Sequence, residues 1–176
     1  MLISVSILIL MASIFFLSLH ALWTDVRSMI IENWTCVAIF SLALVRFVVA
    51  PDTFYWWDFA LFSGFLIIGI FISNANFIGA GDIKLLSALI LWFGISHTEH
   101  MILGLGLIIL AITIPFILAR QYNLLIFAEP YIKKIIPSFD AESPPIPYAI
   151  GIVPGAIYAL YEQFVTFSKL GVITYA

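Results

Sequence analysis

The amino-acid sequence predicts an all-α, polytopic membrane protein with about six transmembrane helices and its N-terminus outside. Two observations carry this fold class. Hydrophobic residues make up 64% of the 176 residues and charged residues 10%, whereas a soluble domain carries roughly a quarter charged residues. The apolar residues also gather into long runs separated by short polar breaks. Such a composition cannot cover a surface exposed to water, so we expect contact with the lipid bilayer and no nucleic-acid partner.

The apolar runs are long enough, or nearly long enough, to cross about 30 Å of hydrocarbon. They cover residues 2–23, 34–50, 56–78, 83–97, 101–119 and 146–167. The first has no charge before it and runs for about 20 residues, which favours a retained helix over a cleaved signal peptide. The second and fourth are short for a span, but short spans can thin the bilayer, so we keep both.

The longest break, residues 120–145, is predicted to be a cytoplasmic interfacial segment followed by a loop. Its first part combines apolar residues with Lys133 and Lys134, as in helices that lie in the membrane interface. Its second part is rich in proline and serine and is typical of a loop. We see no internal repeat, and therefore expect a single membrane domain over residues 1–176.

The basic residues orient the predicted helices. Cytoplasmic loops of membrane proteins carry an excess of Lys and Arg. With the N-terminus outside, the cytoplasmic breaks of this chain carry most of its basic residues, namely Arg27, Lys84, Arg120, Lys133 and Lys134. Asp25 and Asp82 then both lie at the cytoplasmic face of a multi-pass protein of the cytoplasmic (inner) membrane.

The stretch FIGAGDIKLLSALILWFG places the carboxylate of Asp82 at the start of an apolar helix. One interpretation is a catalytic acid, because ionisable side chains at membrane depth are costly and usually face a polar cavity. The other is a helix N-cap that accepts a hydrogen bond from the first turn. A cap needs one permissive residue, whereas Gly79 and Gly81 together leave space beside the carboxylate. Lys84 could tune Asp82 or attract a substrate acid, although we favour snorkelling to lipid headgroups.

Asp25 is the first charged residue of the chain and follows the first apolar run. The helix dipole disfavours a negative side chain at a helix C-terminus, so something has to offset that cost. Taken alone, Asp25 is more simply an ordinary interfacial acid. Together with Asp82, on a separate helix that ends on the same predicted face, it suits aspartic protease chemistry. Two carboxylates brought together share a proton, so that one activates water while the other polarises the scissile carbonyl.

Three stretches resemble one family. GAGDIKLLSALILWFG resembles the GxGD motif of the type IV prepilin peptidases. TDVRSMIIENW resembles their first aspartate motif, with Asp25 and Asn33 in register but Glu32 in place of a proline, a departure that puts the local turn in doubt. IPYAIGI is similar to the Pro-aromatic motif, here at Pro147, that begins the last helix. The resemblance covers about residues 20–165.

The resemblance implies an intramembrane-type aspartic endopeptidase that cleaves the basic leader of a prepilin or pseudopilin at the cytoplasmic face, just before the apolar segment of the substrate. Asp25 and Asp82 would be the catalytic pair, with no metal or other cofactor. Motif residues beside the substrate would be Gly79, Gly81, Lys84, Asn33 and Pro147. The chain looks like the short form without the methyltransferase portion, as for Flp (tight-adherence) pili. The alternatives are an archaeal preflagellin-type peptidase, a non-catalytic membrane assembly subunit or a small transporter. Nothing in the sequence specifies the oligomeric state.

Other polar and small residues receive simpler interpretations. In the break SHTEH, His97 and His100 would need a third firm ligand and a defined geometry to bind a metal, so we expect an exposed polar loop facing away from the aspartates. Cys36 lies in an apolar run and is predicted to be a small buried hydrophobe. Gly151 and Gly155 have the spacing of a helix-packing site, but Pro154 interrupts it, so we predict a kinked packing site.

Overall fold

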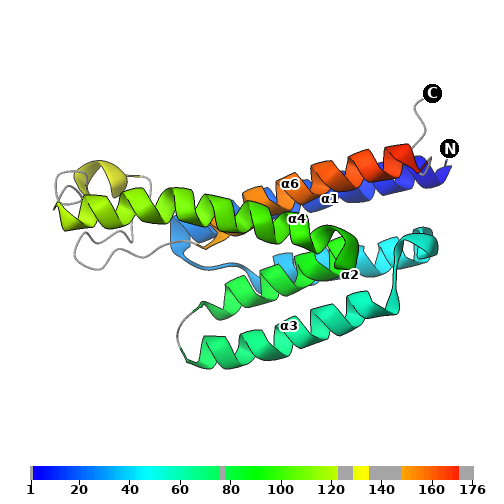
Figure 1. Ribbon diagram of the computed structural model, residues 1–176, viewed down its shortest axis with the longest axis horizontal. Coiled ribbons are helices and arrows are strands. Elements are labelled where there is room, and N and C mark those ends of the chain that lie inside the picture. The colour runs from blue at the N-terminus through cyan, green and yellow to red at the C-terminus, as the bar shows by residue number, and fades with distance from the viewer. Residues whose placement is uncertain (1, 76–77, 123–128, 135–147, 171–176) are drawn as a thin grey trace.

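The computed structural model describes residues 2–75, 78–122, 129–134 and 148–170, and every regular element within these ranges is a helix. The all-α prediction is therefore confirmed for this part of the chain. Figure 1 shows an elongated bundle in which the start of α1 and the end of α6 lie at the same end of the long axis. The elements are α1 (Leu2–Ser28), α2 (Asn33–Val49), η1 (Pro51–Thr53), α3 (Trp56–Asn74), α4 (Ala80–Gln121) and α6 (Ala149–Lys169).

The first helix is longer than the apolar run that predicts it. α1 continues to Ser28, so Asp25 lies within its last turn and not beyond its end. Met29 then adopts a φ of 55° and donates its N–H to the carbonyl of Asp25 at 2.8 Å. A residue in the left-handed region is a common way to end a helix, and the chain enters α2 four positions later, at Asn33.

The break predicted between the fourth and fifth runs lies earlier in the chain than expected. α4 reverses direction at Gly94, whose φ is 63° and ψ is −176°, and Figure 1 shows the chain doubling back there. A Cβ at Gly94 would also lie 2.8 Å from Oδ1 of Asp58. The turn therefore requires glycine both for its positive φ and for the space beside Asp58. The expectation of an exposed loop at SHTEH is wrong. These residues are helical, and His97 and Thr98 are buried because their side chains face the interior of the bundle.

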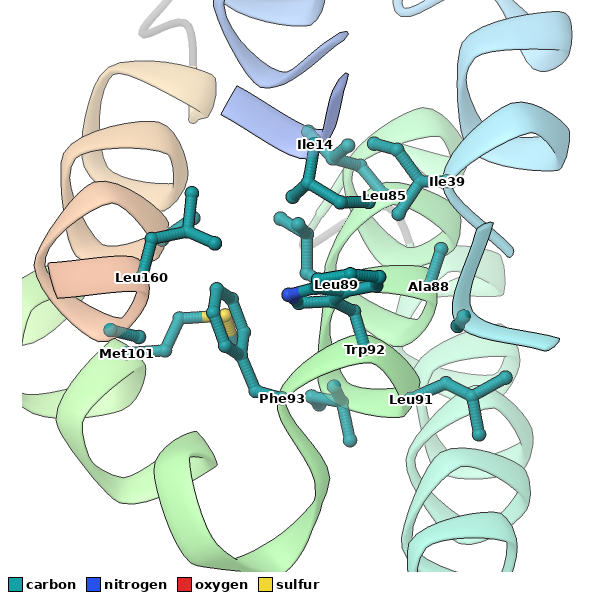
Figure 2. Packing of buried hydrophobic residues seen from close by; sticks show 14 of the residues in the cluster. Ile14, Ile39, Leu85, Ala88, Leu89, Leu91, Trp92, Phe93, Met101 and Leu160 are labelled. Atoms are coloured by element: carbon teal, nitrogen blue, oxygen red, sulfur yellow. The ribbon is translucent and has the colours of Figure 1, made fainter. Parts of the chain in front are cut away.

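The first half of α4 forms the centre of the bundle. Every residue from Ala88 to Phe93 is at most 3% exposed. Figure 2 shows this helix between Ile14 of α1, Ile39 of α2 and Leu160 of α6. Because lipid tails are as apolar as leucine, close packing holds such helices together in a membrane.

The second half of α4 packs closely on α6 through small residues. A Cβ at Gly155 would lie 2.6 Å from the carbonyl oxygen of Met101, and one at Gly104 would lie 2.9 Å from Cα of Gly155. Only glycine permits such an approach of two backbones. The interpretation of Gly155 and Gly151 as a packing site is confirmed, and α6 continues as a helix through Pro154.

A buried charge lies at the end of the bundle where α2 finishes. Arg46 is 2% exposed and donates hydrogen bonds to the carbonyl oxygens of Trp92 and, at 2.7 Å, of Thr53. Its guanidinium group lies 5.5 Å from the ring centre of Trp92 and 5.6 Å from that of Phe167. Such cation–π contacts are favourable when both partners are desolvated.

Asp58 supplies the countercharge to Arg46 and caps two helices. Its Oδ2 accepts a hydrogen bond from the N–H of Tyr55 at 2.9 Å, at the start of α3. Its Oδ1 accepts one from the N–H of Ile95 at 2.7 Å, where the second half of α4 begins. We call Arg46, Asp58 and the residues bonded to them the arginine cluster. It holds α2, α3 and α4 together at one end of the bundle.

Within the residues that the structure describes, four helices are long and apolar enough to cross a membrane, and a shorter apolar helix, Asn33–Val49, accompanies them. One of the four, Ala80–Ala111, contains the reversal at Gly94. The count of six spans and the outside N-terminus remain predictions. Of the segment predicted to lie in the interface, residues 120–145, the structure describes the end of α4 and residues 129–134, which form a helical turn.

Candidate active site

Asp25 is buried at the junction between the first and last helices. The residue is 5% exposed, and its Oδ2 accepts a hydrogen bond from the N–H of Ala149 at 3.1 Å. Ala149 is the first residue of α6, and the N-terminus of a helix attracts negative charge. This contact offsets the unfavourable position of Asp25 at the C-terminus of α1. No local sequence pattern predicts this contact, because the two residues lie 124 positions apart.

Asp82 lies in the first turn of α4 and is also buried. The N-cap interpretation is wrong, because the helix begins at Ala80 and the N–H of Ile83 bonds to the carbonyl oxygen of Gly79. Oδ1 of Asp82 is buried and has no hydrogen-bond partner among the described residues. A buried polar atom without a partner costs roughly 1–3 kcal/mol. Local helix geometry therefore does not explain why this carboxyl group is kept inside.

The structure brings Asp25 and Asp82 to the same end of the bundle from two separate helices. They are close enough for the charge of Asp25 to act on Asp82. We call this the aspartate end. The arginine cluster lies at the opposite end, since α2 runs from Asn33 to Val49 between them and rises about 1.5 Å per residue.

Two glycines precede Asp82, and each permits a different close approach. A Cβ at Gly79 would lie 2.7 Å from Oδ2 of Asp82, so a side chain there would press on the carboxyl group. A Cβ at Gly81 would lie 3.2 Å from Cβ of Ile31, in the connection between α1 and α2. Both glycines have a negative φ. Gly79 therefore lies beside the carboxyl group, whereas Gly81 makes room for Ile31 and not for Asp82. Neither position depends on an unusual backbone conformation.

Asn33 and Lys84 contact one another beside the aspartates. Nζ of Lys84 donates a hydrogen bond to Oδ1 of Asn33 at 2.9 Å, on the exposed surface. Lys84 therefore ties the first turn of α4 to the first residue of α2, a partner that the snorkelling interpretation did not include. Pro147, the remaining predicted motif residue, lies outside the described residues.

Glu32 stands where the resembled motif has proline, and its backbone conformation is one that proline could adopt. Glu32 has a φ of −67° and a ψ of 131°, and proline fixes φ near −65°. The carboxylate of Glu32 accepts a hydrogen bond from Nε1 of Trp34 at 2.6 Å and lies 3.8 Å from Nε2 of His20. The substitution therefore leaves the turn before α2 in place and holds the new side chain on the surface.

Other candidate ligands do not form a metal site in the described part of the chain. No group of three or more His, Cys, Asp or Glu residues there is arranged to hold a metal ion. His97 and His100 lie with their ring centres 6.3 Å apart at the end of the bundle that holds the arginine cluster, away from the aspartates. Cys36 is buried, as predicted.

Comparison with known families decides what kind of protein this is. A model of the type IV leader peptidase family matches residues 5–122. The chain belongs to this family. The match includes both aspartates and the glycines before Asp82, and it ends before α6, which supplies the partner of Asp25. Comparison with curated proteins and with solved structures gives no match. The family match and the long apolar helices together indicate a leader-peptidase-like protease that is a multi-pass membrane protein.

Proposed function

We propose that this chain is an aspartic endopeptidase of the cytoplasmic membrane that cleaves the leader of prepilins or pseudopilins at the cytoplasmic face. Asp25 and Asp82 are its catalytic residues in this proposal. One observation carries it: two buried carboxyl groups on separate helices lie close enough to interact electrostatically, in a chain of the leader peptidase family. The unpartnered Oδ1 of Asp82 adds support, because a buried polar atom with no structural partner is often kept for chemistry.

The hydrogen bonds of the two carboxyl groups assign their roles. The N–H of Ala149 favours an ionised Asp25, which takes a proton from water as the water oxygen bonds to the scissile carbonyl carbon. Asp82 carries the shared proton and gives it to the carbonyl oxygen. The C–N bond then breaks, the amine nitrogen takes the proton from Asp25, and one hydroxyl of the diol returns a proton to Asp82. Peptide and water are consumed, and the pair is restored.

The surroundings of the pair support the proposed orientation and form. Arg27, in the last turn of α1, and Lys84 both lie at the aspartate end, and cytoplasmic ends of membrane helices are rich in such residues. Residues 29–32 alone connect α1 to α2. This connection holds no methyltransferase portion, which is the feature expected of the short form that serves Flp pili.

The test is co-expression with a candidate prepilin, with loss of the leader followed by a gel shift. Wild type should process the substrate, whereas Asp25→Asn and Asp82→Asn should not. Asp52→Asn is the matched control, because Asp52 is an exposed acid in η1 and its loss should leave processing unchanged. Processing by a well-expressed Asp82→Asn variant would exclude the proposed mechanism.

A second substrate distinguishes the alternatives. A preflagellin processed in preference to prepilins would identify the archaeal type of peptidase, with the same two aspartates required. If wild type processed neither substrate under conditions where a known leader peptidase does, the chain would be a non-catalytic assembly subunit or a transporter.

A further inference from the structure

A small apolar cavity lies directly beside Asp82. It has a volume of about 160 Å³ and is enclosed by α3, both halves of α4 and the start of α6. Its walls include Phe65, Ile72, Leu86 and Ile152, and Asp82 is the single charged side chain among the described residues that line it. The cavity therefore joins an ionisable group to a space suited to an apolar side chain.

The cavity borders the least enclosed helix of the bundle. Among the described elements, the backbone of α3 comes close to that of α4 alone, although Phe59 and Phe62 also contact aromatic rings of α2. Figure 1 shows α3 at the margin of the bundle. Gly69 marks a close approach, since a Cβ there would lie 2.3 Å from Cγ2 of Ile83. Beside this contact, Ile68 and Ile72 line the cavity while also being exposed on the outer surface. A membrane-embedded segment can thus reach the cavity laterally, past α3.

We propose that this cavity is the subsite for the side chain of the first apolar residue after the scissile bond. The inference rests on the proposed function. A substrate whose carbonyl carbon lies at Asp82 can place one neighbouring side chain in the cavity that Asp82 lines. The basic leader does not suit it, because burying an unpaired charge among apolar walls is costly. The apolar segment on the other side of the bond suits it.

The size of the cavity sets the expected specificity. An apolar cavity of about 150 Å³ holds a benzene ring in another protein, so about 160 Å³ accommodates a leucine or phenylalanine side chain. A second hollow, of about 350 Å³, lies between α2, α3 and α4 and includes Lys84 and Asn33. It lacks both aspartates, so it does not place a side chain next to the reacting carbonyl.

Two tryptophan variants on α3 test the subsite. Ile72 lines the cavity, whereas Ile70 lies two positions away on the same helix, is exposed and does not line it. Ile72→Trp should lower processing of a prepilin with Phe after the scissile bond at least tenfold, and of one with Ala less than threefold. Ile70→Trp should change neither rate. Equal losses on both substrates, or no loss in Ile72→Trp, would overturn the subsite.

Cross-linking separates this proposal from the proposed function, because it needs no cleavage. In an Asp25→Asn, Cys36→Ala background, Ile72→Cys should cross-link through a short bismaleimide to a cysteine at the first apolar residue of the prepilin, and Ile70→Cys should not. Selective cross-linking without cleavage by wild type would support the cavity and reject the peptidase. Cleavage by wild type without selective cross-linking would support the peptidase and reject the cavity.

Discussion

Asp58 and Asp82 are both buried aspartates near the start of a helix, yet they differ in their hydrogen bonds and in the charge beside them. Both oxygens of Asp58 accept hydrogen bonds from backbone N–H groups, and Arg46 provides a countercharge. Oδ1 of Asp82 has no partner within the described chain, and the nearby charge of Asp25 has the same sign as its own. The fold therefore satisfies the hydrogen bonding of Asp58, whereas it leaves Oδ1 of Asp82 without a partner in the described residues.

This difference separates an acid that holds the fold from one that is available for chemistry. A satisfied carboxylate contributes stability, because it caps two helices and neutralises a buried cation. An incomplete carboxyl group contributes little to stability and can exchange its proton or bind a substrate atom. Burial alone does not distinguish the two, since Asp58 is 1% exposed and Asp82 is 9% exposed.

The largest expected effect is on catalysis at the aspartate end. Asp82→Asn should lower the rate of prepilin processing by roughly 10²–10⁴-fold, the usual contribution of a general acid or base. Its unfolding temperature in detergent should equal that of wild type, because no hydrogen bond to the unpartnered Oδ1 is lost. A clear drop in unfolding temperature would show that Asp82 is structural after all.

The corresponding substitution in the arginine cluster, Asp58→Asn, should have the opposite effect, with lower stability and retained activity. Asp58→Asn leaves Arg46 without its countercharge and directs an amide donor at one of two backbone N–H groups, so unfolding should become easier by about 3 kcal/mol. Thermal unfolding in detergent measures this loss. The folded fraction should still process prepilin, and an inactive Asp58→Asn protein of normal stability would contradict the comparison.

A smaller effect is expected from closing the space over Asp82. Gly79→Ala places a Cβ 2.7 Å from Oδ2, and the resulting displacement should lower processing roughly tenfold to a hundredfold. Gly64→Ala in α3 is the matched control, because a Cβ there meets nothing within 4 Å. The control should retain activity and gain up to about 1 kcal/mol of stability. Equal activities of the two variants would show that Gly79 is dispensable.

The smallest effect concerns the connection before α2. Glu32→Pro should change the free energy of unfolding by less than about 1 kcal/mol, because the native φ of −67° already suits proline. Met29→Pro, in the same connection, should destabilise clearly, since its φ is 55°. Denaturation of both variants in detergent tests this contrast. A large loss in Glu32→Pro would mean that the contacts of the Glu32 side chain, and not its backbone, determine the turn.

The sequence predicted what is local and missed what joins distant segments. Apolar runs located the helices, and Gly79 indicated the space beside Asp82. The reversal at Gly94 was predicted a few residues too late, because SHTEH has the composition of a loop, although it is helical and buries His97 and Thr98. The arginine cluster and the contact from Asp25 to Ala149 depend on tertiary packing, which no local pattern reveals.

The contact between Asp25 and Ala149 also has a consequence for how the protein is made. Chains are synthesised from the N-terminus, so α1 enters the membrane well before α6 exists. Until residue 149 has emerged from the ribosome, Asp25 lacks the N–H group that favours its ionised form. A nascent chain would therefore hold both aspartates without an assembled pair. Under the proposed function, proteolytic competence would arrive only with the last helix.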